Sequence, residues 1–510
     1  MDNPLNNLDK DSQKVETLLK ESVTEPDRKS SGTMDSYDSN LFEEEIGLPH
    51  WVEKFNEWRR KFMSDYLFLL WLATAIGALA GFAAHIFNRL ISILSNIFMR
   101  HIKPGEVNWW LIFIPIIGIL IAGIYTRYII HTNLTHGVTQ LTRDIFKGKF
   151  LLKRNLIYSP IIGSTITLGF GGSAGSEGPI AYAGAAIGSN LGRVLGLKPN
   201  MIKVLIGCGA GAGISGIFMS PIGGLLFTLE CLKLEIGTYS ILAVTLACIV
   251  AYGIVFICNG CVPIHEFTPL ESLQPEHYWS VLLLGLFCGL YSLYYSEAIN
   301  RTDSFFGKIT NPWIRNISGG LVIGICLLLF PALYGVGYPL MSETIHEHFN
   351  DILTGNIFFI KGGAWGMIIV AGCILILKCW ACGSCNASGG VSSDFAPTLF
   401  AGGIAGFFFS MLANQIPGVE LPVGIFTFLG MGAVMAGVIE APLMTIFIVL
   451  NMGMKWEYAV AISLAVFSSY ITVRACSHLR GYDNKVLRHL HWFHDHDNTT
   501  TTTEPTPSSK

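Results

Sequence analysis

The sequence has few charged residues for its length. Only 14% of its 510 residues are Asp, Glu, Lys or Arg, whereas a soluble protein carries about 25%. The charges that it has are concentrated at the N-terminus, where the first fifty residues hold twelve acidic and five basic residues. The rest of the chain is too apolar for soluble domains of ordinary size to bury. We therefore expect an all-α, polytopic integral membrane protein.

Other absences exclude further classes of protein. The net charge is −3 and no block of basic residues is present, so no nucleic-acid partner is expected. The acidic N-terminus has neither the basic start nor the apolar run of a signal peptide. The 12 cysteines are spread through a long chain, unlike the dense framework of a small disulfide-bonded domain. No Ser-His pair or HExxH-type motif supports an intramembrane enzyme, so the chain is not expected to be an enzyme.

Apolar runs that could span a bilayer begin at Tyr66. They cover residues 66–99, 109–130, 156–170, 241–257, 279–295, 317–329, 366–377 and 426–450. Residues 1–58 are predicted to form a disordered acidic tail, residues 59–490 the membrane domain, and residues 491–510 a disordered Thr-rich tail. Basic residues flank both the first and the last membrane segment, so the positive-inside rule places both termini in the cytoplasm.

The membrane domain contains an internal repeat. The matching segments are residues 209–230 (GAGAGISGIFMSPIGGLLFTLE) with 430–451 (GMGAVMAGVIEAPLMTIFIVLN), and residues 177–188 (EGPIAYAGAAIG) with 395–406 (FAPTLFAGGIAG). Two matches in the same order predict a duplication, with halves of about residues 60–258 and 276–490. Duplicated segments interrupted by Gly and Pro are typical of transporters whose binding site lies near the membrane midplane.

Glu177 is the strongest candidate for a functional group. Burying a carboxylate at membrane depth costs free energy, so such a residue is expected to have a stabilising partner or a functional role. Glu177 lies at the predicted start of a half-helix, where free backbone amides and the helix dipole favour negative charge. The same amides favour chloride, so the carboxylate and the ion would compete and Glu177 would act as a gate. The alternative is a structural glutamate that caps the helix.

The second half offers an equivalent half-helix start at Phe395-Ala396-Pro397, without an acid. Its amides are predicted to face the same ion, and the preceding Asp394 is a plausible N-cap. The alternative is an ordinary turn between a loop and a helix.

Three cysteines precede this turn. Cys379, Cys382 and Cys385 are spaced three apart, which on a helix forms one face that could hold a soft metal. No fourth ligand lies nearby, so packing of small residues at a helix end is the better interpretation, and no metal is expected.

These segments resemble the signatures of the CLC family of chloride channels and chloride/proton antiporters. Residues 175–179 (GSEGP) match the family signature GKEGP or GREGP, and residues 220–227 match APxGGxLF. Residues 389–390 and 395–397 match GGxFAP, with three extra residues between the two parts. Residues 430–443 match GMGA…RAPL with Glu440 in place of the usual Arg, and Tyr482 matches a pore-lining tyrosine. The resemblance covers roughly residues 60–490 in order.

The resemblance implies a homodimer in membrane lipid, with one anion pathway per subunit and with tilted and broken helices in inverted repeats. Chloride in such proteins is held by backbone amides and hydroxyls, without a metal or other cofactor. Carried over to this chain, the anion-binding residues are His136, Gly137, Glu177, Gly178, Phe395, Ala396 and Tyr482. A prokaryotic type without a C-terminal regulatory domain is expected, in a bacterial inner or cell membrane.

The first signature, usually GSGIP, departs from the family pattern. It falls on residues 135–139 (THGVT), where His136 replaces the serine that gives its hydroxyl to the ion. An imidazole at this position could make anion binding sensitive to pH. Alternatively His136 only packs or caps, and Thr135 could supply the missing hydroxyl.

A second departure concerns proton transport. The family's antiporters commonly carry a Glu-Glu pair near the cytoplasmic side, which here reads Glu230-Cys231. A thiol is a poor proton relay at neutral pH, so the sequence favours a voltage-gated chloride channel. The alternative is chloride/proton antiport through Glu230, His136 or water. A cation-coupled solute transporter is more remote, because it would need acids or carbonyls where Glu177 has amide donors.

Overall fold

The computed structural model describes residues 50–100, 108–132, 134, 137–234, 237–263, 267, 273–346, 363–453 and 456–479. The chain divides into two compact units, Met1–Trp58 and Arg59–Lys510. Most of the first unit and the whole of the predicted C-terminal tail lie outside the described residues, and for these residues the tails stay predictions. Residues 50–58 were assigned to the disordered N-terminal tail, but they belong to a helix (His50–Phe62), so the prediction is wrong for this part.

The first half of the membrane domain is a series of helices of very different lengths. They are α3 (His50–Phe62), α4 (Asp65–Met99), η1 (Trp109–Ile112), α5 (Phe113–Ile124), η2 (Tyr125–Ile130), α6 (Gly137–Phe146), η3 (Arg154–Ile157), α7 (Ser159–Gly169), α8 (Glu177–Val194), α9 (Pro199–Phe218), α10 (Pro221–Leu226), η4 (Phe227–Cys231) and α11 (Thr238–Cys258).

The second half repeats this series. It contains η5 (Pro275–His277), α12 (Tyr278–Gly307), α13 (Pro312–Leu329), η6 (Pro331–Leu333), α14 (Tyr338–Ile345), α16 (Ala364–Ala387), α17 (Phe395–Ala413), α18 (Val423–Ile439), α19 (Pro442–Gly453), η7 (Trp456–Tyr458) and α20 (Ala459–Leu479). In the described ranges no strand is formed, and the single extended pairing is an antiparallel bridge between Gly175 and Ser393.

Nine of the described helices are long and apolar enough to cross a membrane. This confirms the all-α membrane fold. The helices differ in how much of their surface the protein covers: 89% of the most apolar stretch of α9 and 83% of that of α17 is buried, against 33% for α11. Helices α9 and α17 therefore form the interior, while α11 presents most of its surface outward.

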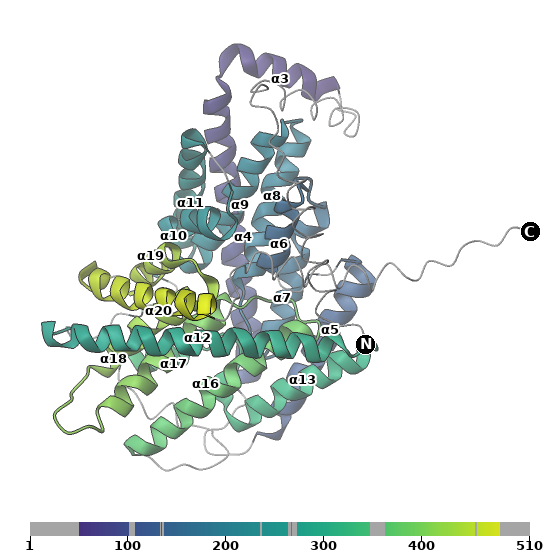
Figure 1. The fold of residues 1–510 in the computed structure, drawn as a ribbon. Coiled ribbons are helices and arrows are strands. Elements are labelled where there is room, and N and C mark those ends of the chain that lie inside the picture. Colours follow the sequence, from purple (N-terminus) through teal and green to yellow (C-terminus); the bar gives the residue numbers. More distant parts are fainter. Residues whose placement is uncertain are drawn as a thin grey trace, which may run out of the picture. The chain divides into compact units, whose positions relative to one another are not determined.

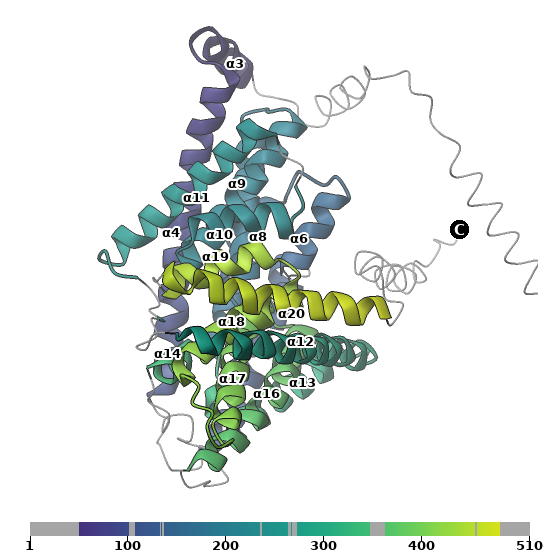
Figure 2. The ribbon, with the colours of Figure 1, turned by 60° about the vertical axis from the view of Figure 1, so that its left-hand side comes forward.

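The duplication predicted from the sequence is present in the packing. In the first half α4, α9 and α11 pack on one another, and in the second half their equivalents α12, α18 and α20 do the same. Figures 1 and 2 show α12 and α20 running side by side. The two halves also contact each other directly, for example where α5 packs on α13 and α10 packs on α19.

Glycine allows the interior helices of both halves to approach closely. A Cβ on Gly184 of α8 would collide with the carbonyl oxygen of Gly209 in α9, and a Cβ on Gly209 would collide with that of Gly184. The same reciprocal contact joins Gly402 of α17 and Gly430 of α18. Small residues at helix contacts are typical of membrane bundles, and here they occupy equivalent places in the two halves.

Two predicted spans are wrong. The run over residues 156–170 is divided between η3 and α7, and α7 has only 11 residues and is not among the helices long enough to cross a membrane. The apolar run over residues 426–450 is two helices, because Glu440 adopts a left-handed conformation (φ 60°) after α18 and Pro442 then begins α19. Its equivalent in the first half is Met219, which is also left-handed (φ 53°) before Pro221. Both breaks are therefore part of the repeated architecture, and hydropathy alone does not reveal them.

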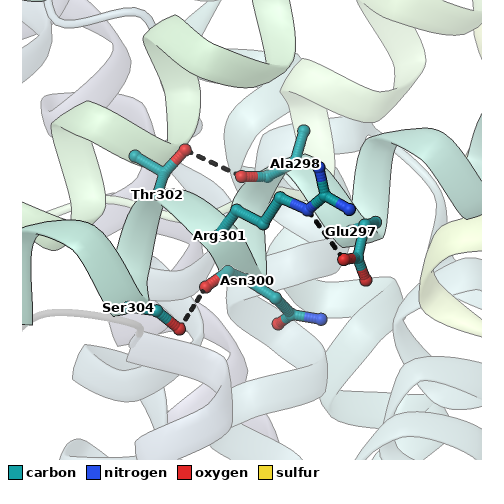
Figure 3. Close-up of polar contacts among 6 residues, drawn as sticks. All are labelled: Glu297, Ala298, Asn300, Arg301, Thr302 and Ser304. Atoms are coloured by element: carbon teal, nitrogen blue, oxygen red, sulfur yellow. Dashed lines mark hydrogen bonds and ion pairs between the residues drawn. The ribbon is translucent and has the colours of Figure 1, made fainter.

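Polar side chains near the end of α12 find partners on their own helix. Near the end of α12, Thr302 Oγ1 donates to the carbonyl oxygen of Ala298 at 2.7 Å, and Arg301 Nε pairs with Glu297 Oε1 at 2.8 Å (Figure 3). A membrane interior offers no water to satisfy such groups. Bonding one turn back along the helix satisfies the hydroxyl of Thr302 without a partner from outside.

Candidate functional site

The site is formed by two equivalent turns between helices, residues 170–176 and 388–394, which we call the first and second elbow. In each half a helix ends, the chain turns, and a half-helix begins: α7 leads to α8, and α16 leads to α17. Gly171 (φ 85°) and Gly389 (φ 108°) take left-handed conformations just after α7 and α16, which a residue with a Cβ adopts with difficulty. The positions are equivalent, since each glycine lies six residues before its half-helix.

The two elbows are joined to each other. Gly175 N–H donates to Ser393 O at 2.7 Å, and Ser393 N–H donates to Gly175 O at 3.0 Å. Each of these residues lies two positions before its half-helix. A reciprocal antiparallel pair between equivalent residues is the arrangement that a local twofold axis produces, so the starts of α8 and α17 lie together at the centre of the inverted repeat.

This pairing corrects the alignment with the GGxFAP signature. By equivalence with Gly171 and Gly172, the glycines Gly389 and Gly390 end α16. The two positions that the signature gives to glycine are then taken by Ser392 and Ser393, and no three residues are inserted.

Both half-helices begin with amides that the helix itself does not use. In α8 the third residue is Pro179, which has no N–H, and the next amide, Ile180 N–H, bonds to Ser176 O at 3.3 Å. Only the amides of Glu177 and Gly178 remain for another acceptor. In α17 Pro397 occupies the same place, Thr398 N–H bonds to Asp394 O at 3.2 Å, and the amides of Phe395 and Ala396 remain.

The carboxylate of Glu177 takes up part of this donor set. Glu177 is fully buried, and its Oε2 accepts the N–H of Ala396, from the opposite half-helix, at 3.3 Å. Ser176 Oγ donates to the other carboxylate oxygen at 3.3 Å, and the Tyr338 hydroxyl, at the start of α14, is also hydrogen-bonded to the carboxylate. The side chain folds back so closely over Gly175 that a Cβ there would collide with Oε2.

A third helix start reaches the same place. A Cβ built on Gly137, the first residue of α6, would lie 3.0 Å from the carbonyl carbon of Gly178. A Cβ on Gly178 would lie 2.9 Å from Ser393 Cβ and 3.3 Å from Val138 N. The N-termini of α6, α8 and α17 therefore meet, as the predicted grouping of Gly137, Gly178 and Phe395 requires. Their positive dipole ends together favour an anion.

Asp394 is placed differently from the prediction. It occupies the N-cap position of α17, but its carboxylate makes no capping hydrogen bond there. Instead Asp394 Oδ1 accepts hydrogen bonds from the side-chain amide of Asn386 and from Cys382 Sγ, the thiol at 3.3 Å, both on α16. The carboxylate of Asp394 therefore caps none of the first amides of α17, and Phe395 N–H donates instead to Ser393 Oγ at 3.4 Å.

Lys378 is a residue near the site that the sequence interpretation missed. Its side chain is fully buried on α16, and Nζ donates to Ser173 Oγ at 2.9 Å and to the carbonyl oxygen of Gly335 at 3.1 Å. It also lies 4.7 Å from the centroid of the Phe400 ring in α17. The signal was available: Lys378 is the single charged residue in the apolar α16 segment.

The pair proposed for proton transport lies against α19. Glu230 accepts the N–H of Met444 at 2.8 Å and that of Leu443 at 3.3 Å, so its carboxylate caps the start of that helix. Cys231 Sγ contacts Met444 Sδ at 3.6 Å. Neither residue hydrogen-bonds to a residue of the Glu177 site in the described part of the chain.

Other predicted site residues lie outside the described ranges. They are Thr135, His136 and Tyr482, whose roles stay predictions. Among the described residues, no three His, Cys, Asp or Glu side chains are placed to hold a metal ion.

Comparison with known proteins identifies the family. The family described as "Voltage gated chloride channel" matches residues 135–474. The chain belongs to this family, the CLC family. The family's description names a channel for chloride, and a relative of this chain is named an H(+)/Cl(-) exchange transporter, so the family is one of ion channels and transporters.

Relatives of known type lie within this family. A putative chloride channel protein, ClcB-like, from Ralstonia nicotianae is 26% identical over 374 residues, covering 72% of this chain and 83% of the relative. The H(+)/Cl(-) exchange transporter ClcA of Klebsiella pneumoniae is 27% identical over 406 residues, covering 77% and 82%.

Solved structures show the same fold. A slow cyanobacterial Cl-/H+ antiporter superposes with a TM-score of 0.66 at 20% identity, covering 80% of this chain and 94% of that one. A CLC-type fluoride/proton antiporter superposes with a TM-score of 0.63 at 22% identity, covering 79% and 94%.

Proposed function

We propose that this chain carries chloride across a membrane in exchange for protons, with Glu177 as the gate. The proposal rests chiefly on one contact, the hydrogen bond from the Ala396 amide to the Glu177 carboxylate. Amides at two facing half-helix starts form a site for one negative charge, and the carboxylate occupies it. When Glu177 swings away or takes up a proton, the same donors become available to chloride.

One of the two relatives supports exchange over passive conduction, whereas the Ralstonia relative is named a putative chloride channel. The Klebsiella relative is named an H(+)/Cl(-) exchange transporter, and two similar folds belong to proton-coupled antiporters. A gate that binds a proton in order to release an anion site also couples the two ions directly, since Glu177 is itself the proton acceptor.

A passive chloride channel is the second candidate, and the cytoplasmic pair favours it. The carboxylate of Glu230 is held by two α19 amides, and Cys231 offers a thiol beside Met444 instead of a second acid. An exchanger with this pair would move protons to Glu177 along water or through His136.

The homodimer and the cytoplasmic position of both termini remain part of the proposal. Static light scattering of the detergent-solubilised protein would give the mass of the assembly. Twice the mass of one chain supports the homodimer, and the mass of a single chain excludes it.

The function is tested in proteoliposomes under a chloride gradient, with the membrane potential clamped and the external pH recorded. We expect chloride to move down its gradient and protons to move uphill, and we expect Glu177→Gln to abolish the proton movement. Glu420→Gln is the matched control, because Glu420 is an exposed carboxylate in the loop between α17 and α18. Chloride flux without proton movement would identify a channel, and absence of chloride flux would refute the proposal.

A further inference from the structure

The side chain of Asp394 is held away from a position that it would ordinarily occupy. An aspartate at an N-cap normally accepts the amide of the second or third residue of its helix. In α17 the third residue is Pro397, which has no N–H, so the available amide is that of Ala396. This is the amide that Glu177 Oε2 accepts. Asp394 and the gate are therefore acceptors for the same donor.

A short network of polar side chains, anchored on α16, holds the Asp394 carboxylate away from the Ala396 amide. Asn386 donates its amide N–H to Asp394 and accepts with its Oδ1 the hydroxyl of Ser392, and Cys382 donates its thiol to Asp394 at 3.3 Å. Asn386 and Ser392 are both buried. Because Asn386 bonds to both Ser392 and Asp394, its position fixes where the carboxylate of Asp394 points.

The charge of Asp394 is unusual when it is compared with the equivalent residue of the first half. Ser176 takes the place of Asp394 before α8, and it also leaves its helix uncapped. Its hydroxyl carries no charge and donates to Glu177. Asp394, by contrast, brings a carboxylate to within one residue of the anion-binding amides.

We propose that Asp394 is a restrained competitor for the anion site, and that Asn386 and Cys382 set the chloride affinity by holding its carboxylate on α16. Once released, the Asp394 side chain accepts the amides of Phe395 and Ala396 and excludes chloride from them. Asn386 is thus a positioning residue that acts through Asp394. The inference rests on the proposed function, since it concerns the same amides.

Calorimetric titration of the detergent-solubilised protein with chloride tests it. Asn386→Ala should raise the dissociation constant for chloride at least about fivefold, because the released Asp394 carboxylate would form an N-cap hydrogen bond of typical strength with an amide that chloride needs. In an Asp394→Ala background, Asn386→Ala should cause no further change, and Asp394→Ala alone should bind chloride as tightly as the natural chain or more tightly. An equal loss of affinity in both backgrounds would overturn the proposal, because it would show that Asn386 acts on the fold rather than through Asp394.

A second pair of variants covers the case in which Asn386→Ala does not fold. Cys382→Ala removes a donor to Asp394, whereas Cys385→Ala removes a buried thiol one turn further along α16 that bonds to Ser392 and not to Asp394. We expect weaker chloride binding in the first variant and unchanged binding in the second. Equal affinities would contradict the inference. Absence of chloride binding in the unsubstituted protein would instead refute the proposed function.

Discussion

At the scale of single residues, the proposed function implies that the charge on Glu177 determines whether the central amides are occupied. Protonation removes that charge and weakens the bond from Ala396, so chloride flux should rise as the pH falls. In Glu177→Ala the competing acceptor is gone, and flux should be faster at neutral pH and nearly independent of pH in the acidic range. Chloride efflux from proteoliposomes at stepped pH measures both. The series is repeated in a His136→Ala background, which removes the second titratable group. If Glu177→Ala leaves the pH dependence of chloride flux unaltered both with and without His136→Ala, Glu177 is excluded as the gate.

Lys378 acts at the same scale by tying the first elbow to the second half. Its ammonium group donates to Ser173, four residues before Glu177, and to the carbonyl oxygen of Gly335. Lys378→Met keeps the length of the side chain but leaves buried acceptors without a donor, which destabilises a protein by about 1–3 kcal/mol. We expect a lower thermal unfolding midpoint in detergent. Lys308→Met, a change at a lysine just after the end of α12, should leave the midpoint unchanged.

At the scale of elements, the meeting of α6, α8 and α17 requires a residue without a side chain at Gly178. A Cβ there would approach Ser393 Cβ to 2.9 Å and Val138 N to 3.3 Å, so Gly178→Ala should push the helix starts apart and reduce chloride flux strongly. Gly372→Ala, in α16, is the matched control because the nearest atom, Phe408 Cε2, lies at 3.4 Å. Flux is compared at equal protein content. Equal flux in the two variants would mean that close approach at Gly178 is not needed.

The helices and turns that form the site could be predicted from the sequence, but the contacts between their side chains could not. The repeat and the two half-helix starts followed from glycine and proline spacing, which records local backbone requirements. Interior helices such as α9 were absent from the predicted spans, although the most apolar stretch of α9 has a higher mean hydropathy than that of the segment that contains α12. The contact of Tyr338 with Glu177 joins residues distant in sequence, and no local pattern carries that information. The direction of the Asp394 side chain depends on how the turn after α16 brings it back to Asn386 and Cys382, which residue spacing alone does not give.

At the scale of the whole molecule, exchange requires a proton route between the cytoplasmic side and the buried gate. Glu230, which is predicted from the sequence to lie on that side, accepts an amide at the start of α19, and the adjacent position is Cys231. Under the proposed function the molecule thus combines a gate that binds protons with a cytoplasmic end whose thiol is a weak proton donor. This combination predicts slow exchange, in which proton delivery rather than the anion path limits the rate.

Restoring an acid at the cytoplasmic end tests this limit. Cys231→Glu should increase the number of protons moved per chloride and speed exchange, because a carboxylate exchanges protons at neutral pH far more readily than a thiol. Cys231→Gln introduces a side chain of the same size without the acid and should leave the ratio unchanged. Chloride and pH electrodes in one proteoliposome suspension record both fluxes. If the two variants move protons equally, the route does not pass Cys231, and delivery to Glu177 occurs through water alone. If neither the natural chain nor Cys231→Glu moves protons while chloride still flows, a carboxylate at this end is insufficient for coupling, and the molecule is a channel.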